Sequence, residues 1–323
     1  MRVILPAIAA LTAAGCGYIA EPLPPLANIP GRVNDLTTVQ RGGRIIAQFT
    51  APRTTTEGFT IKSPLDLDLR IGPGPEPFRE EVWAASARRV MPISTAEGIA
   101  KYEIPAAEWT GKEVLIAARV TGSNGKNSGW SSFLVLPVVS PPERPTELRI
   151  ENTADGLHLT WRARGSDFRV FRRTANSAFM PVADVQQPVW TDTTTQFGQP
   201  YSYQVRTIVK LGENREAESE FSSEESLTPI DMFPPAPPAG LRALAAPNSI
   251  ELSWERNTEA DFASYRIYRA TSGRPLEKVA DVNLPSYSDH AIEHGKIYRY
   301  EISAVDQVGN ESPHSAPAEA AVP

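Results

Sequence analysis

The sequence contains a single cysteine, Cys16, among its 323 residues. No disulfide can form within the chain, so each folded domain must be stabilised by its apolar core. Long hydrophobic runs are also missing, because no stretch after Gly15 approaches the roughly 20 apolar residues that span a bilayer. Positive charge is in deficit, with 32 basic against 38 acidic residues, which argues against a broad nucleic-acid-binding face. We therefore expect no nucleic-acid partner.

The first residues combine one positive charge with a short apolar run. Arg2 precedes VILPAIAALTAAG, a pattern that predicts a secretory signal peptide over residues 1–15. The run ends in LTAAGC, which resembles a bacterial lipobox, because the small residues Ala13–Gly15 stand before a cysteine that becomes the lipidated N-terminus. The motif departs from the commonest pattern in having Ala13 where Leu is usual.

The lipobox resemblance implies that Cys16 carries the lipid, palmitate included, that holds the mature protein on a membrane. Gly17 follows the cysteine in place of Asp, which implies sorting to the outer membrane if the bacterium has two membranes. We therefore expect a lipid-anchored protein of the bacterial cell envelope, with a proline-rich tether over residues 16–30. Cleavage without lipidation, or a retained anchor, are the alternatives.

An internal repeat determines the organisation of the rest of the chain. The segments VADVQQPVWTD and VADVNLPSYSD begin 97 residues apart, and Tyr201 and Tyr298 keep the same offset. Apolar and polar residues alternate in LHLTW and IELSW, which end at Trp161 and Trp254. A period of two is typical of half-buried strands, and no convincing amphipathic helix follows the signal. We expect an all-β chain of three tandem, immunoglobulin-like β-sandwiches.

The later copies resemble fibronectin type III domains. Each opens with prolines, in PPERPTEL and PPAPPAGL, and each has a Tyr-x-Tyr motif in a late strand. The resemblance implies that Trp161 and Trp254 are core residues and that Tyr201 and Tyr298 form the tyrosine corner of the family. A true immunoglobulin domain is disfavoured because it expects a cysteine pair.

The first copy is divergent, with Phe49 at the Trp position and Val114 at the corner. Some 20 extra residues lie inside it, around GPGPEPFREEVWAASARR, and NSGWSSF, which contains Trp130, is expected to be its last strand. The predicted division is a signal peptide at 1–15, a tether at 16–30, a divergent type III-like domain with an insertion at 31–140, and type III domains at 141–232 and 233–323.

One catalytic motif needs consideration. HAIEH, from His290 to His294, fits the H-x-x-E-H pattern of some zinc peptidases, which requires both histidines on one helix. Gly295 follows at once and no third ligand is evident, so we expect a solvated turn, no metal, no cofactor and no catalytic residue. A zinc hydrolase using His290 and His294 remains a remote alternative.

Trp83 and Trp109 fit no position of the repeat. They are candidates for an exposed ligand platform, such as a sugar-stacking face, and the alternative is that they pack the insertion onto the sandwich. Together these features favour a non-enzymatic, lipid-anchored envelope protein that acts as an extended binding, adhesion or display module. Its partner would be an unknown protein or a polysaccharide, and a structural spacer in an envelope assembly is the alternative function.

Overall fold

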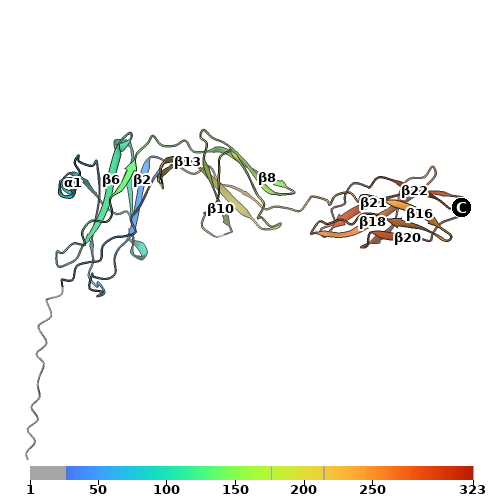
Figure 1. Ribbon diagram of the computed structural model, residues 1–323, viewed down its shortest axis with the longest axis horizontal. Helices are drawn as coiled ribbons and strands as arrows, with labels where there is room; N and C mark the ends of the chain where they lie inside the picture. Colours follow the sequence, from blue (N-terminus) through green and yellow to red (C-terminus); the bar gives the residue numbers. More distant parts are fainter. Residues whose placement is uncertain (1–26, 176, 214, 323) are drawn as a thin grey trace, which may run out of the picture. The chain divides into compact units, whose positions relative to one another are not determined.

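The computed structural model describes residues 27–175, 177–213 and 215–322, which form an almost purely β-stranded chain (Figure 1). The predicted signal peptide, Cys16 and the tether up to residue 26 lie outside the described residues. The chain divides into two compact units, one up to Pro141 with Lys210–Ala217, and one formed by the remaining residues from Pro142 on. None of the described helices is long and apolar enough to cross a membrane.

The first unit contains a sandwich of two antiparallel sheets. One sheet has the order β1-β2-β5 and the other β4-β3-β6-β7. Their bounds are β1 (Thr37–Arg41), β2 (Arg44–Thr50), β3 (Asp66–Gly72), β4 (Arg88–Val90), β5 (Ile99–Pro105), β6 (Glu113–Thr121) and β7 (Leu134–Pro137). Phe49 and Val114, at the positions of the Trp and the corner Tyr in the other copies, are both buried in the core between the sheets.

The extra residues of the first copy carry the helical structure of this sandwich. Helix α1 (Glu80–Ser86) lies between β3 and β4, and two short 3-10 turns, η1 (Ala96–Gly98) and η2 (Ala107–Trp109), flank β5. The sequence shows no convincing amphipathic helix after the signal, and this short helix is an addition to a chain that is otherwise all-β as expected. A helix of two turns is too short to produce a recognisable 3.6-residue pattern, and a single side chain, Trp83, accounts for its burial.

The second and third sandwiches each pair a three-stranded sheet with the strands of a second sheet. In the second sandwich the orders are β12-β9-β8 and β11-β10-β13, with β15 also paired to β13. The bounds are β8 (Thr146–Thr153), β9 (Gly156–Arg162), β10 (Phe168–Thr174), β11 (Met180–Val185), β12 (Val189–Asp192), β13 (Tyr201–Gly212), β14 (Arg215–Glu218) and β15 (Glu225–Leu227).

The third sandwich repeats this arrangement, with orders β16-β17-β20 and β19-β18-β21-β22. Its bounds are β16 (Arg242–Ala246), β17 (Ser249–Ser253), β18 (Phe262–Thr271), β19 (Glu277–Val282), β20 (Ser286–Asp289), β21 (Ile297–Asp306) and β22 (Ala318–Ala321). A β-bulge falls between Val170 and Phe171 in β10 and between Ile267 and Tyr268 in β18, again 97 residues apart. These are the sandwiches expected of fibronectin type III folds.

The aromatic residues singled out by the repeat lie in the two later cores. Trp161 and Trp254 are 6% and 7% exposed and pack edge-to-face against Phe168 and Tyr265, at centroid distances of 5.6 and 5.1 Å. The tyrosine at the start of β13 accepts a hydrogen bond from a backbone N–H five residues upstream, and so does its counterpart in β21. The two contacts are Gln196 N to Tyr201 Oη at 3.0 Å and Glu293 N to Tyr298 Oη at 2.9 Å.

The predicted last strand around Trp130 is not a strand. The flanking Ser128 and Ser131 instead accept, through Oγ, hydrogen bonds from the backbone N–H groups of Val120 (3.1 Å) and Ala118 (3.0 Å) in β6. Side-chain hydroxyls thus replace the main-chain acceptors that a strand would supply. The same Ser-x-x-Ser element recurs beside β13 and β21, in the pairs Ser219 and Ser222, and Ser312 and Ser315.

A buried carboxylate closes the core of the second sandwich. Asp192 Oδ2 accepts hydrogen bonds from Tyr203 Oη at 2.7 Å and from Arg172 at 2.6 Å. Burial by itself would raise the pKa of Asp192, but the hydrogen bonds from Thr194, Tyr203 and Arg172 outweigh it and lower the pKa. The trio recurs 97 residues later as Asp289, Tyr300 and Arg269.

We predict that Asp192→Asn lowers the stability of the second sandwich at pH 7 by about 2 kcal/mol, because a charged hydrogen-bond acceptor is lost. Since the folded-state pKa lies below the unfolded value of about 4, this contribution is complete above that value and disappears as the pH falls through the folded pKa. The difference between the urea midpoints of the variant and the parent should therefore begin to shrink as the pH falls below about 4, and it should disappear only below the folded pKa. Asp184→Asn, at an exposed carboxylate, serves as the control, and a difference that did not shrink at all on acidification of the folded protein would contradict the assignment.

Candidate functional site

The outward side of β3, β4 and β6 in the first sandwich carries a group of arginines, here called the arginine face and defined by Arg70, Arg89, Arg119 and the central Asp68. Along β3 the side chains alternate, so that Leu69 is fully buried in the core while Asp68 and its neighbour Arg70 lie on the other side of the sheet. The register places Asp68 opposite Arg119 of β6, and Arg70 opposite Arg89 of β4.

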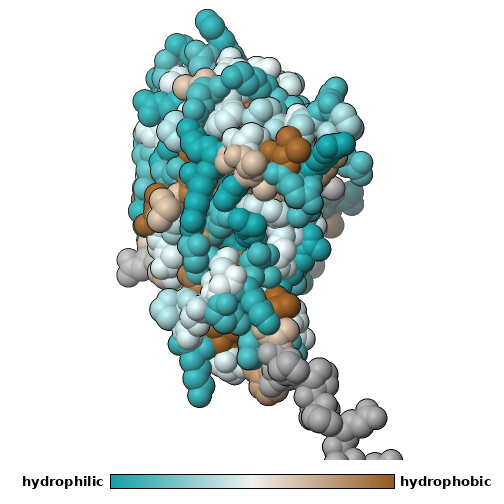
Figure 2. All heavy atoms as spheres, turned by 90° about the vertical axis from the view of Figure 1, so that its left-hand side faces the viewer, coloured by the Kyte–Doolittle hydropathy of each residue, from teal (hydrophilic) through white to brown (hydrophobic). Residues whose placement is uncertain are grey.

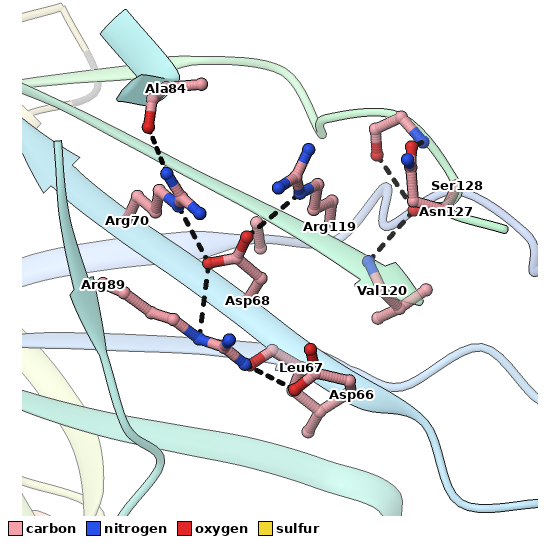
Figure 3. A network of polar contacts seen from close by, with 12 residues as sticks. Asp66, Leu67, Asp68, Arg70, Ala84, Arg89, Arg119, Val120, Asn127 and Ser128 are labelled. Carbon is pink, nitrogen blue, oxygen red and sulfur yellow. Dashed lines mark hydrogen bonds and ion pairs between the residues drawn. The ribbon is translucent and has the colours of Figure 1, made fainter. Parts of the chain in front are cut away.

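One carboxylate is shared by three guanidinium groups (Figure 3). Asp68 Oδ1 lies 3.0 Å from Arg70 Nε and 3.6 Å from Arg89 Nε, and Oδ2 lies 3.0 Å from Arg119 Nε. The Asp68 side chain is only 4% exposed, whereas the three arginines are 21–40% exposed. Arg89 also pairs with Asp66, which leaves three positive charges against two negative ones on this face.

Aromatic rings support the arginine face from below. The Arg119 guanidinium lies 4.4 Å from the centroid of Trp130, and the Arg70 guanidinium lies 5.5 Å from it. Trp83 of α1 then packs edge-to-face on Trp130 at 5.4 Å and on Phe133 at 4.9 Å. Helix α1 is thereby fixed to the sheet, and the Ala84 carbonyl accepts a hydrogen bond from Arg70.

The proposed tryptophan platform does not form. Trp83 is completely buried and its indole N–H points to the Gly72 carbonyl at 3.4 Å, so it offers no ring face to a ligand. Trp109 is half-buried against the core of the first sandwich, with the cations of Arg88 and Lys112 at 5.4 and 6.0 Å from its ring. The two indoles belong to different apolar clusters, because the insertion uses Trp83 to pack on the sheet.

The charge at the position of Asp68 is reversed in the later sandwiches. The position of Asp68 is occupied by Arg169 in β10 and Arg266 in β18, since Val170–Val205 and Ile267–Ile302 pair as Leu69 and Ala118 do. These arginines are paired with acidic residues on neighbouring segments, Arg169 with Asp184 and Glu218, and Arg266 with Asp281 and Glu311.

The three sandwiches also differ in the residue just before each Ser-x-x-Ser element, which lies near the outer-face arginines. It is Glu218 before Ser219 and Glu311 before Ser312, but Asn127 before Ser128. Glu218 also pairs with Arg206, the β13 residue at the position of Arg119 in β6. The first sandwich therefore lacks the acidic residue that neutralises the corresponding arginine in the second.

The arginine face was missed in the sequence, although its signal was present. LDLDLRI places two carboxylates and a guanidinium at alternate positions of a strand, which is the pattern of a charged outer face. What the sequence does not state is that Arg89 and Arg119 converge on Asp68 from other strands, because that depends on the register.

The HAIEH segment does not form a metal-binding helix. His290 follows the end of β20 and its Nδ1 lies 3.2 Å from the Asn248 carbonyl, while His294 lies in a turn with Gly295. Within the described ranges, the carboxylates that come close enough to share a cation are those of Asp231, Asp261 and Asp306, whose oxygens lie within 4.8 Å of one another.

The carboxylate of Asp306 already has partners in its own turn. One oxygen accepts the backbone N–H groups of Val308, Gly309 and Asn310, and the other accepts the Asn310 side-chain amide at 2.8 Å. Burial alone would raise the pKa of Asp306, but these hydrogen bonds lower it. The carboxylate therefore has a structural role in this turn.

The face of the molecule drawn in Figure 2 is mainly hydrophilic. On the face in Figure 2, hydrophobic residues appear as separate spots among polar ones, with no continuous apolar patch. Several large apolar side chains are nevertheless exposed in the insertion of the first sandwich, including Phe78 (49%) and Val82 (48%). The arginine face, where three guanidinium groups surround one carboxylate, is thus the candidate binding surface of this sandwich.

No protein-family model matches the chain. Exoglucanase B of Cellulomonas fimi is 24% identical over 181 residues, which cover 54% of this chain and 16% of that protein. An amylopullulanase of Thermoanaerobacter thermohydrosulfuricus is 39% identical over 88 residues, 27% of this chain and 6% of that protein. The chain thus spans only a small part of the length of these curated relatives.

The similar solved structures are of fibronectin type III domains. The FN1–FN3 domains of chicken CNTN1 are 14% identical, cover 91% of this chain and 99% of their own, and give a TM-score of 0.29. An Fn3-like protein from Clostridium thermocellum is 32% identical over 28% of this chain and 96% of its own, with a TM-score of 0.25.

We predict that Asp68→Asn destabilises the first sandwich by about 2 kcal/mol, because three partly buried guanidinium groups lose their shared counter-charge. Asp66→Asn on the same strand is the matched control, and its exposed side chain should contribute no more than about 0.5 kcal/mol. Urea denaturation followed by tryptophan fluorescence measures both changes. Equal losses for the two variants would show that Asp68 does not organise the arginines.

Proposed function

We propose that this chain is a non-enzymatic, lipid-anchored protein of the bacterial cell envelope, which uses tandem fibronectin type III sandwiches to present a binding surface. The observation that carries the proposal is the reversal of charge at one position of a shared scaffold. Asp68 with its three arginines replaces the arginine–acid pairs found at the same register in the other sandwiches. A shared sandwich scaffold whose outer charges differ from copy to copy is consistent with function that depends on the surface and not on the fold.

The net charge of the chain follows the same division. Residues 27–141 contain 13 basic and 11 acidic residues, whereas residues 142–323 contain 18 basic and 26 acidic residues. The first sandwich therefore has a small positive charge, and the remainder of the chain is strongly negative. This asymmetry supports a binding role for the first sandwich, because charge complementarity governs which partners approach a surface.

The proposed anchor is Cys16, at the end of a signal peptide over residues 1–15. The lipobox-like LTAAGC supports this, and Gly17 after the cysteine favours the outer membrane in a bacterium with two membranes. A lipoprotein cysteine carries several acyl chains, and more than one chain is needed for lasting attachment. The domain limits proposed from the sequence, 31–140, 141–232 and 233–323, would then place the first sandwich next to the membrane in chain order.

The non-enzymatic part of the proposal is supported by the surroundings of the polar residues. The buried carboxylates Asp68, Asp192 and Asp289 are each engaged by arginines on adjacent strands, as structural ion pairs are. His290 and His294 lie in a connection between strands and not on a common helix. The named relatives are enzymes, but the aligned part covers 16% or less of their length.

A structural spacer in an envelope assembly is the alternative. It is supported by the proline-rich segments PPERP and PPAPP at the starts of the second and third sandwiches, since such segments are semi-rigid. A photo-crosslinking residue introduced at position 119 in intact cells distinguishes the two functions, with position 303, at the same register of the third sandwich, as the matched control. A binding surface predicts adducts at Arg119 and few at Ser303, whereas a spacer predicts no difference.

We predict that Cys16→Ala abolishes acylation and moves the protein from the membrane fraction to the soluble fraction. The reason is that the acyl chains on Cys16 are the proposed means of attachment, and Ala offers no thiol to carry them. Mass spectrometry of the mature N-terminus measures the lipid directly, and fractionation measures its effect. An unmodified Cys16 in the parent protein, or a mature N-terminus elsewhere, would overturn the anchor.

A further inference from the structure

The arginine face retains hydrogen-bonding capacity that the folded chain does not use. Arg119 contacts Asp68 through Nε alone, and its two terminal nitrogens make no hydrogen bond or ion pair with another described residue. Figure 3 shows the single contact between Arg119 and the Asp68 carboxylate. The Trp130 ring holds the guanidinium in place from one side, so the free donors are oriented before any ligand arrives.

This unused capacity is specific to the first sandwich. At the same register of the second sandwich, Arg206 pairs with Glu218 and is 5% exposed, and in the third the β21 residue is Ser303. The acidic position is Asn127 in the first sandwich. With Asn127 at this position, Arg119 keeps Asp68 as its partner but has no counterpart of the Glu218 carboxylate that pairs with Arg206 in the second sandwich.

The chain enters the first sandwich beside this face. The Asn28 carbonyl accepts a hydrogen bond from the side-chain amide of Asn124 at 3.1 Å, in the loop that follows β6. Arg32 donates to the backbone carbonyl of Trp130, the residue that supports Arg119. The chain at Asn28 and Arg32 therefore lies near the end of the sheet that carries the arginine face.

We propose that the arginine face docks on anionic phospholipid headgroups and holds the first sandwich against the membrane to which the chain is attached. The choice of a lipid surface rests on the proposed anchor at Cys16, because a tether joined beside the face keeps it close to headgroups at high effective concentration. Guanidinium groups bind phosphate through paired N–H donors. The acidic remainder of the chain is repelled by the same surface, so only the first sandwich lies on it.

The test separates docking from anchoring by removing the lipid. The mature chain with Cys16→Ser is mixed with phosphatidylcholine vesicles, with or without phosphatidylglycerol, and binding is measured by flotation at 50 and 300 mM salt. We expect weak binding that requires phosphatidylglycerol and weakens with salt. Asn127→Glu, which introduces the acid of the other sandwiches, should lower the affinity about fivefold to tenfold, because the contribution of roughly one basic residue is lost.

Asn127→Gln is the matched control, because it has nearly the same shape as the glutamate variant without its charge, and its binding should equal that of the parent. Equal vesicle binding by the glutamate and glutamine variants would overturn the proposal, as would binding that ignores phosphatidylglycerol. Stronger binding to soluble polyglutamate or polygalacturonate than to the vesicles would also overturn it, in favour of an acidic polymer. Loss of the lipid on Cys16 is scored separately by mass spectrometry, so the two failures are distinguishable.

Discussion

In each sandwich, the register between two central antiparallel strands determines which of their side chains enter the core and which face outward. Leu69 pairs with Ala118, Val170 with Val205 and Ile267 with Ile302, and all six side chains are fully or almost fully buried. Because side chains alternate along a strand, this register also fixes which residues face outward. A shift of one residue would place Asp68 in the core, where an isolated charge is not tolerated. The pairing therefore specifies the core and the outer face together.

The three sandwiches share more of their core residues than of the charged residues on their outer faces. The cores repeat with small changes, such as Phe49 for Trp161 and Trp254. Each outer face has an ion-pair network at the same register. Its central residue is an acid, Asp68, in the first sandwich and an arginine, Arg169 or Arg266, in the others. The central carboxylate of the first network, Asp68, and the Arg206–Glu218 pair of the second are nearly buried, so each charge there needs its partner. The aromatic rings beneath the networks, Trp130 and Phe221, provide a constant support for guanidinium groups of either arrangement.

Much of the fold was readable from the sequence, because alternation and the 97-residue offset are local signals. LHLTW and IELSW fall in β9 and β17, and the sequence-based expectation of an all-β chain of sandwiches is confirmed. A strand around Trp130 was predicted wrongly. The segment lies beside β6 as a strand would, but the hydroxyls of Ser128 and Ser131, and not its backbone carbonyls, accept the hydrogen bonds from β6. Helix α1 was missed because Trp83 is its one buried residue, and a single buried position gives no 3.6-residue hydrophobic pattern in the sequence. The arginine face required the register, which brings Arg89 and Arg119 to Asp68 from distant positions.

The serine-rich segments protect the borders of the sheets from pairing with strands of neighbouring molecules. A regular strand at the border of a sheet exposes unpaired backbone groups that recruit strands from neighbouring molecules. In this chain Ser128 and Ser131 occupy the N–H groups of β6 with hydroxyls, on an irregular backbone that offers little template for a second chain. Copies packed side by side would thus resist fusing into shared sheets and stay separate.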